Sequence, residues 1–264
     1  MLEARRLRWL QISSAGYTRY DTAEFRKAAR ERQLLVTSSS SVYAEPCAEH
    51  VLASMLAQSR RLLEALGAVR AGPGADSATW HRLRHTATLL RNQRVVILGF
   101  GSIGRRLVEL LKPFSMEITA LRREPKGDEG VSMVTAEHLP QALARADHVV
   151  NLLPATPDSA RFVSAALFAA MREGSAFYNI GRGATVDHDA LRAALRFGRP
   201  AAAWLDVTEP EPLPPGHPLL DMPQCFITPH IAGGHQGESQ NLVRHFVENL
   251  HRFLGGAPLR DRVI

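Results

Sequence analysis

Short apolar segments alternate along this chain with longer segments in which apolar residues recur every three or four positions. The short segments predict strands over residues 7–12, 34–37, 95–98, 117–121, 148–153, 176–180, 201–207 and 226–228. The longer segments predict helices over residues 22–31, 44–66, 107–111, 139–144, 165–171, 187–197 and 238–254. Strands that alternate with helices in this way favour a parallel sheet with helices on both faces, so we expect an α/β fold.

A glycine-rich turn joins the apolar run 95–98 to the helix that follows it. Residues 99–104 read GFGSIG, which places glycines at the three positions of a dinucleotide-binding fingerprint. Gly99 turns the chain, Gly101 lets the backbone approach a pyrophosphate, and Gly104 lets the helix pack closely on the strand. The backbone N–H groups of Ser102 and Ile103 begin the helix and face the anion. The alternative is a glycine-rich turn that binds nothing.

The next predicted strand ends in two arginines, Arg122 and Arg123. Arg122 lies in the window where an NAD-binding unit usually carries an acidic residue for the ribose 2′-hydroxyl. A carboxylate there repels a 2′-phosphate, whereas an arginine attracts one and can lie on the adenine face. We therefore predict NADP(H) as the preferred cofactor and NAD(H) as the weaker one. A charged strand end without a cofactor role is the alternative.

Composition narrows the range of partners. The 264 residues carry a net charge of +6, but the basic residues are scattered and no nucleic-acid recognition motif accompanies them. No apolar run is long enough to span a membrane, and the first ten residues do not resemble a signal peptide. Cys47 and Cys225 belong to no disulfide or metal-binding pattern, and the histidines form no ligand cluster. We expect a cytoplasmic enzyme that binds no nucleic acid, no membrane and no metal.

Four polar residues follow predicted strand ends, where ligands bind in a parallel sheet: Arg182, Asp206, Glu211 and His230. Each of them alone is more often structural than catalytic. Beside a nicotinamide site they form a mechanism for a 2-oxo acid. Arg182 offers a planar fork to the carboxylate, and His230 can protonate the carbonyl oxygen as hydride arrives. A carboxylate hydrogen-bonded to the histidine favours its protonated form; Glu211 is the better candidate, with Asp206 as a second nearby charge.

These motifs together resemble the D-isomer-specific 2-hydroxyacid dehydrogenases. The matching segments are residues 99–104 (GFGSIG), 179–183 (NIGRG), 206–212 (DVTEPEP) and 228–232 (TPHIA), with 47–50 (CAEH) in the family's interdomain helix. The similarity runs from about residue 7 to the C-terminus. It implies a Rossmann-type doubly wound parallel sheet with a partial flavodoxin-like substrate domain.

The resemblance also implies roles for particular residues. Arg182, Glu211 and His230 are expected to be catalytic, with Arg182, Ala15 and Gly16 near the substrate carboxylate. The expected cofactor-binding residues are Gly99, Gly101, Ser102, Ile103, Gly104, Arg122, Arg123, Pro154, Thr156, Ile180, Gly181, Asp206 and Gly233. A homodimer through the Rossmann-like domain and the helix 44–66 is implied as well.

Departures from the family's pattern sharpen the expectation. Arg122 stands where NAD-dependent members keep an acidic residue, and in this the chain resembles the NADPH-linked glyoxylate and hydroxypyruvate reductases. The same residue argues against the branch of phosphoglycerate dehydrogenases. Glu211 argues against formate dehydrogenases, in which a glutamine pairs with the histidine. Only six residues precede the segment that matches 7–11, so we expect a partial substrate domain over residues 1–68. A cofactor domain over 69–233 and a C-terminal helix over 234–264 complete the expected division, with residues 71–75 as a boundary.

Two readings follow from these observations. The first is an NADPH-dependent reductase of glyoxylate or hydroxypyruvate. The alternative is a catalytically impaired NADP(H)-binding protein that acts by association, because part of the substrate domain is missing. A start codon upstream of Met1 would remove the reason for this alternative.

Overall fold

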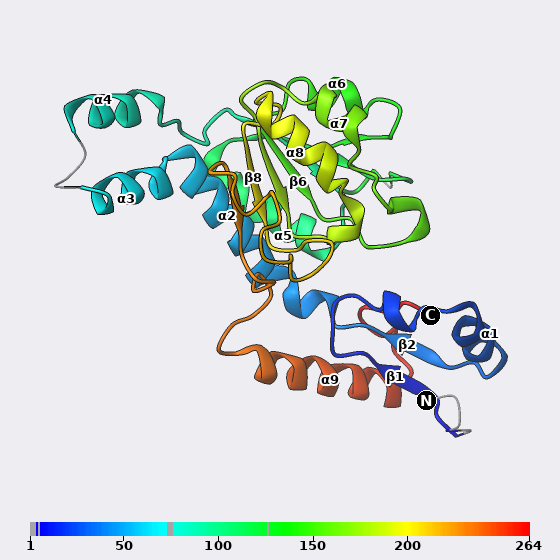
Figure 1. The fold of residues 1–264 in the computed structure, drawn as a ribbon. Coiled ribbons are helices and arrows are strands. Elements are labelled where there is room, and N and C mark those ends of the chain that lie inside the picture. The colour runs from blue at the N-terminus through cyan, green and yellow to red at the C-terminus, as the bar shows by residue number, and fades with distance from the viewer. Residues whose placement is uncertain (1–3, 5, 73–75, 126) are drawn as a thin grey trace. The chain divides into compact units, whose positions relative to one another are not determined.

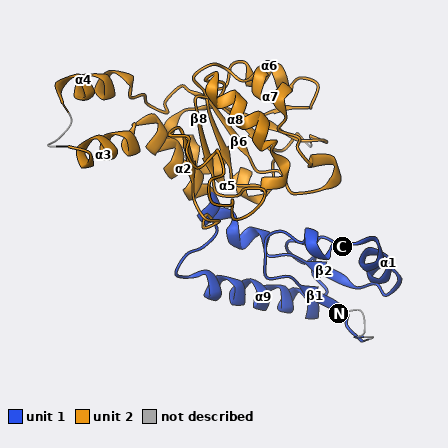
Figure 2. Ribbon diagram, in the orientation of Figure 1, with its two compact units in different colours: residues 1–47, 233–264 blue, residues 48–232 orange. Residues whose placement is uncertain are grey.

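The computed structural model describes residues 4, 6–72, 76–125 and 127–264, and its contacts divide the chain into two compact units (Figure 2). The smaller unit combines the ranges 1–47 and 233–264, and the larger unit comprises 48–232. The contacts leave the segment 48–68 with the larger unit, whereas the domain boundaries expected from the sequence keep it with the substrate domain.

The larger unit is built on a seven-stranded sheet in which every neighbouring pair of strands is parallel. The strand order is β5-β4-β3-β6-β7-β8-β9. The strands are β3 (Arg94–Leu98), β4 (Glu117–Leu121), β5 (Ser132–Val134), β6 (His148–Asn151), β7 (Ala176–Asn179), β8 (Ala202–Leu205) and β9 (Cys225–Ile227). The chain runs outward from β3 to β5, then returns to the other side of β3 and continues to β9. This is the Rossmann-type order, so the predicted fold class is confirmed.

Helices connect these strands and bury the sheet (Figure 1). The connecting helices are α5 (Ser102–Leu111), α6 (Leu139–Leu143), α7 (Ala165–Ala170) and α8 (His188–Arg196), whereas α2 (Ala44–Ser59), α3 (Leu62–Arg70) and α4 (Ser77–Thr86) precede β3. One core cluster joins alternate strand residues such as Val96, Val149 and Phe177 to Phe168 of α7 and Leu191 of α8. Because alternate residues of a strand face opposite sides, this burial places α7 and α8 on one face of the sheet.

The sheet has its switch point between β3 and β6, since β3 pairs with β4 on one side and with β6 on the other. Connections leave these strands in opposite directions there, which opens a crevice at the carboxyl ends of the strands. The glycine turn 99–104 begins at this crevice, directly after β3.

The helix predicted over 44–66 is interrupted, so that prediction is wrong in its extent. α2 ends at Ser59 and α3 begins at Leu62, with Arg61 between them in the left-handed region at φ 54°. The carbonyl of Ser59 accepts from the backbone N–H of Thr88 at 2.8 Å instead of continuing the helix. The apolar periodicity of the segment gives no sign of this break.

Two further elements lie outside the predicted pattern. α4 follows the expected boundary at 71–75, of which positions 73–75 lie outside the described residues. Its first turn is capped by the Asp76 carboxylate, which accepts from the N–H of Thr79 at 2.6 Å. β5 is a three-residue edge strand, too short to produce a periodic signal.

The smaller unit contains the parallel pair β1 (Trp9–Gln11) and β2 (Leu35–Thr37), with α1 (Ala23–Glu31) and α9 (Glu238–Leu254). Its core is formed by Ile12, Phe25, Ala29, Leu34 and Val36. Thr22 caps α1 by accepting from the N–H of Phe25 at 3.1 Å. Among the described residues, no helix is both long and apolar enough to cross a membrane.

The buried His148 at the start of β6 makes stability depend on pH. Its Nδ1 lies 3.0 Å from the Tyr178 hydroxyl and its Nε2 lies 2.6 Å from Oε1 of Gln93. Burial lowers the pKa of His148 to about 4. An unfolded histidine takes up its proton near pH 6.5, so protons favour the unfolded chain between these two values.

We therefore expect the His148 contribution to be complete above pH 6.5 and to be lost as the pH falls toward 4. Between pH 7.5 and 4.5 the loss amounts to about 2.5 kcal/mol of the free energy of unfolding. Urea titrations of the wild type and of His148→Gln across this range measure it, since all other titrating groups are common to both proteins. Parallel pH dependences in the two proteins would contradict the prediction.

Candidate active site

The glycine turn has the backbone that its sequence predicts. Gly99 has φ 94°, in the left-handed region that favours glycine, and its N–H donates to the carbonyl of Leu121 at the end of β4. A Cβ on Gly104 would lie 3.2 Å from the carbonyl oxygen of Gly99, so a larger residue would crowd the strand. Gly101 precedes α5 as its N-cap, and a Cβ built there meets nothing within 4 Å. The turn therefore leaves room for a ligand beside the first N–H groups of the helix, at Ser102 and Ile103.

Two asparagines that the sequence analysis did not assign hold the neighbouring loops. Asn151 ends β6 and Asn179 ends β7, and both are fully buried. Nδ2 of Asn151 donates to Oδ1 of Asn179 at 2.9 Å and to Oγ1 of Thr185 at 2.7 Å. Oδ1 of Asn151 accepts from the N–H of Leu153, and Oδ1 of Asn179 accepts from the N–H of Gly181. A buried, paired polar network of this kind fixes where the two loops leave the sheet.

These loops carry several of the expected cofactor-binding residues. Pro154 and Thr156 follow β6, where the hydroxyl of Ser159 donates to the Pro154 carbonyl and accepts from the Thr156 N–H at 2.8 Å. Ile180 and Gly181 follow β7 and are buried. The structure thus brings them to the same edge of the sheet as the glycine turn.

Hydrogen bonds to neighbouring residues hold Arg182 at the end of β7. Its carbonyl accepts from the Thr185 hydroxyl at 2.7 Å, and its guanidinium Nη1 donates to the Gly181 carbonyl at 2.6 Å. A Cβ on Gly183 would lie only 1.9 Å from the carbonyl oxygen of Thr208, so this position requires glycine. The loop of Arg182 therefore packs directly on the loop that carries Glu211.

His230 and Glu211 form a hydrogen-bonded pair. Nδ1 of His230 lies 2.5 Å from Oε1 of Glu211, and Oε2 of Glu211 accepts from the backbone N–H of Thr208 at 3.3 Å. With Nδ1 bonded to the carboxylate, Nε2 is the ring nitrogen that can donate a proton to a ligand. The His230 side chain is 50% exposed. It lines a cavity of about 400 Å³ together with Asp206, Thr208, Glu211 and Thr228; Arg182 is not part of its lining.

Asp206 holds the backbone around His230. Its buried carboxylate accepts from the Thr228 hydroxyl at 2.6 Å and from the N–H groups of Ile231 and Ala232, both at 2.9 Å. The Asp206 carbonyl accepts from the His230 N–H at 2.9 Å. His230 itself has φ 54°, a strained conformation for this residue type. The hydrogen bonds of Asp206 on both sides of His230 offset that strain.

Both arginines after β4 are engaged with carboxylates. Nη1 of Arg122 lies 3.0 Å from Oε1 of the buried Glu129, and Nη1 of Arg123 lies 3.1 Å from Oδ2 of the exposed Asp158. Glu129 was not singled out by the sequence analysis, because a glutamate in a polar loop gives no signal of burial.

Three expected site residues belong to the smaller unit. The loop of Ala15 and Gly16 is fixed by the Ser14 hydroxyl, which donates to the Gly16 carbonyl at 2.7 Å. A Cβ on Gly233 would lie 2.9 Å from the ring of Tyr43. Burial, followed by the hydrogen bond to Glu238, raises the pKa of Tyr43 to about 12.

Across the described residues, no three His, Cys, Asp or Glu side chains gather as a metal site would require.

Comparison with known proteins identifies the family. The sequence model of a protein family, the D-isomer specific 2-hydroxyacid dehydrogenase NAD-binding domain, matches residues 52–232. The chain belongs to this family. The predictions of a dinucleotide-binding domain and of a nicotinamide-dependent 2-hydroxyacid dehydrogenase are thereby confirmed.

Individual relatives agree with this membership. A mouse glyoxylate reductase/hydroxypyruvate reductase is 35% identical over 228 residues, which cover 85% of this chain and 67% of the relative. A glyoxylate reductase from Aeropyrum pernix is 33% identical over 96% of this chain and 75% of its own length. The structure of an NADPH-dependent glyoxylate/hydroxypyruvate reductase from Sinorhizobium meliloti, in complex with NADP and sulfate, aligns with a TM-score of 0.82 at 26% identity. That alignment covers 97% of this chain and 78% of the other.

The role of Asp206 leads to a prediction. Asp206→Asn replaces one carboxylate oxygen with an NH2 group, so a backbone N–H of the His230 loop loses its acceptor. We expect the free energy of unfolding to fall by about 2 kcal/mol and dehydrogenase activity to fall with it. Urea unfolding and steady-state rates measure both. Asp221→Asn, an exposed site with the same charge change, is the control; equal behaviour of the two variants would contradict the prediction.

Proposed function

We propose that this chain is an NADPH-dependent reductase of small 2-oxo acids, with glyoxylate or hydroxypyruvate as its substrate. The observation that carries the proposal is the His230–Glu211 pair, which leaves Nε2 of the histidine available beside a cavity at the carboxyl edge of a nucleotide-binding sheet. The relatives named as glyoxylate and hydroxypyruvate reductases support the substrate class.

The chain's own residues divide the work of reduction. When bound, a reduced nicotinamide supplies a hydride from C4 to the keto carbon. Arg182 binds the substrate carboxylate with its guanidinium fork. His230 donates its Nε2 proton to the carbonyl oxygen, so that hydride and proton together yield the 2-hydroxy acid. Glu211 holds Nδ1, which orients the ring and stabilises its positive charge before the transfer.

NADP(H) is the preferred cofactor in this proposal, with NAD(H) as the weaker one. The turn fits a pyrophosphate, because Gly101 opens onto free space at the start of α5. Arg122 stands beside the turn, where it can meet a 2′-phosphate, and Arg123 lies next to it. The Sinorhizobium meliloti relative was crystallised with NADP, which supports the preference.

The proposal extends to the state of the protein in the cell. We infer a cytoplasmic homodimer that binds no nucleic acid and no membrane. Exposed apolar side chains on α3, α4 and the loop after them support self-association: Leu62, Leu63, Leu66, Val69, Trp80 and Leu89. These helices extend away from the sheet in the larger unit (Figure 1).

The alternative of an impaired, associating NADP(H)-binding protein is not favoured, because the His230–Glu211 pair is formed. Oxidation of NADPH by the purified chain with a panel of short 2-oxo acids tests the reaction. NADPH binding without turnover of any of these acids would support the alternative instead.

The proton-transfer step leads to one prediction. His230→Gln removes the proton donor, so we expect kcat for glyoxylate reduction to fall by about 10²–10⁴ while the Kd for NADPH stays within about twofold. Glu211→Gln keeps the hydrogen bond and loses the charge, so we expect a smaller loss of about tenfold. Stopped-flow rates and cofactor fluorescence separate the two quantities. His251→Gln, at an exposed position of α9, is the control; wild-type kcat in His230→Gln would exclude His230 as the proton donor.

Cofactor choice leads to a second prediction. Arg122→Asp replaces the attraction for a 2′-phosphate by repulsion, so the ratio of kcat/KM for NADPH over NADH falls by at least about tenfold. Arg91→Asp makes the same charge change at an exposed site before β3 and serves as the control. A ratio that survives in Arg122→Asp would remove Arg122 from the cofactor site.

A further inference from the structure

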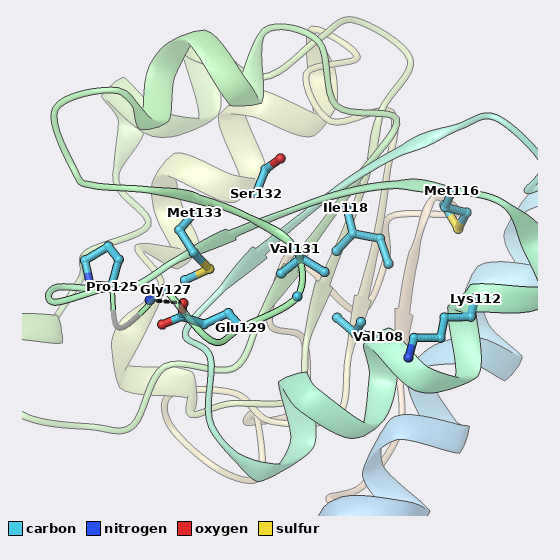
Figure 3. Close-up of a pocket in the computed structure, with 11 residues that line it drawn as sticks. Val108, Lys112, Met116, Ile118, Pro125, Gly127, Glu129, Val131, Ser132 and Met133 are labelled. Carbon is cyan, nitrogen blue, oxygen red and sulfur yellow. Dashed lines mark hydrogen bonds between the residues drawn. The ribbon is translucent and has the colours of Figure 1, made fainter.

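Glu129 lies in the loop between β4 and β5 and has a carboxylate removed from water. Its side chain is 1% exposed. Oε1 lies 3.0 Å from Nη1 of Arg122, and Oε2 accepts from the N–H of Gly127 at 2.8 Å. Figure 3 shows this carboxylate turned toward Gly127, in the wall of a groove that also includes Val131 and Met133. Because burial of a lone carboxylate is costly, its ion pair with Arg122 is maintained in the folded protein.

The partner of this carboxylate is the arginine beside the glycine turn. The N–H of Gly99 donates to the carbonyl of Leu121 at 3.3 Å, so Arg122 directly follows the residue that the turn contacts. The Arg122 side chain is only 23% exposed, and its backbone N–H donates to Val134 of β5 at 3.3 Å. Arg123 differs, because it is 86% exposed and its partner Asp158 is 77% exposed. An exposed pair of this kind restrains the side chain little.

We propose that Glu129 is a specificity-determining residue: its buried carboxylate partly neutralises Arg122 and so moderates the preference for NADP(H) over NAD(H). This inference rests on the cofactor site described under the proposed function. It adds a residue that does not touch the cofactor and acts through its charge, which neutralises Arg122 and repels the 2′-phosphate.

The physical basis is the charge of the 2′-phosphate. A phosphate monoester carries about −1.5 to −2 charges at neutral pH, whereas the ribose 2′-hydroxyl of NAD carries none. A carboxylate in contact with Arg122 cancels much of the guanidinium's charge at the distance of a ligand and repels the phosphate. Binding of the neutral 2′-hydroxyl changes little with either the lower charge of Arg122 or the charge of Glu129. Glu129 therefore weakens binding of the phosphorylated cofactor selectively, while Arg122 keeps its remaining N–H groups and its flat face for either cofactor.

A purely structural role for Glu129 makes the opposite prediction. If the carboxylate served only to hold Arg122 in place, its removal would let the guanidinium move and would weaken binding of a 2′-phosphate. The sign of the change therefore separates the two roles.

Glu129→Gln tests the proposal, because it keeps the shape of the side chain and one acceptor for Arg122. The probes are 2′,5′-ADP and 5′-AMP, which differ by the 2′-phosphate, and their Kd values are measured by calorimetry on the full chain. We expect the affinity ratio of 2′,5′-ADP over 5′-AMP to rise about fivefold in the variant, with 5′-AMP binding unchanged. Glu124→Gln removes the same charge from an exposed position of the same loop and should change the ratio by less than about twofold. An unchanged or lower ratio in Glu129→Gln overturns the proposal.

A second pair of variants covers the case in which Glu129→Gln does not fold. Arg122→Gln removes the arginine from the buried ion pair, and Arg122→Gln combined with Glu129→Gln removes both charges of that pair. The proposal expects 2′,5′-ADP to bind the double variant about fivefold more tightly than the single variant, with equal binding of 5′-AMP. Equal binding of 2′,5′-ADP to both would overturn it.

These measurements are independent of the proposed reaction, since neither probe carries a nicotinamide. A wild-type chain that binds 2′,5′-ADP and turns over no 2-oxo acid would contradict the proposed reaction alone. The effect of Glu129 would still be decided by the change in the affinity ratio between variant and wild type.

Discussion

The structure of the candidate site depends on the need to satisfy polar groups that are buried where parallel strands end. Asn151, Asn179 and Asp206 close β6, β7 and β8 with side chains that water does not reach. An unpaired polar group at such a position costs more than an ordinary hydrogen bond gains, so each side chain must bind a specific part of the backbone. The backbone groups that they bind belong to the loops of Gly181, Arg182 and His230. Folding of the sheet therefore also sets the positions of the groups proposed to react.

Electrostatic pairing organises the cofactor end of the same edge. The two adjacent arginines have the same formal charge but different surroundings, since Arg122 is paired with a buried glutamate and Arg123 with an exposed aspartate. Solvent screens the exposed pair and leaves the buried pair strong. An arginine at the end of β4 is thus not sufficient to define cofactor preference. The net charge that a ligand meets there also depends on the buried carboxylate paired with the guanidinium.

The sequence predicts the features that repeat or that obey a steric rule. β4 and α9 have the predicted bounds, because a short segment rich in apolar residues and a three- or four-residue period are local properties. Gly99 could be assigned from its motif, because its φ of 94° favours glycine. The break at Arg61 and the burial of Glu129 could not be predicted, since both depend on contacts that form only in the folded chain. These are the hydrogen bond from Thr88 to Ser59 and the ion pair of Glu129 with Arg122. Asn151 did give a signal, as a polar residue that follows two valines and precedes two leucines, but only its hydrogen bonds reveal its role.

The proposed proton donor and the side chains that bind its loop belong to one unit. His230, Glu211 and Asp206 all lie within 48–232, as do the backbone groups that bind them. The left-handed backbone of His230 is maintained by hydrogen bonds to Asp206, which directly follows β8. Hydrogen bonds within the nucleotide-binding unit therefore set the geometry of the pair proposed to transfer the proton.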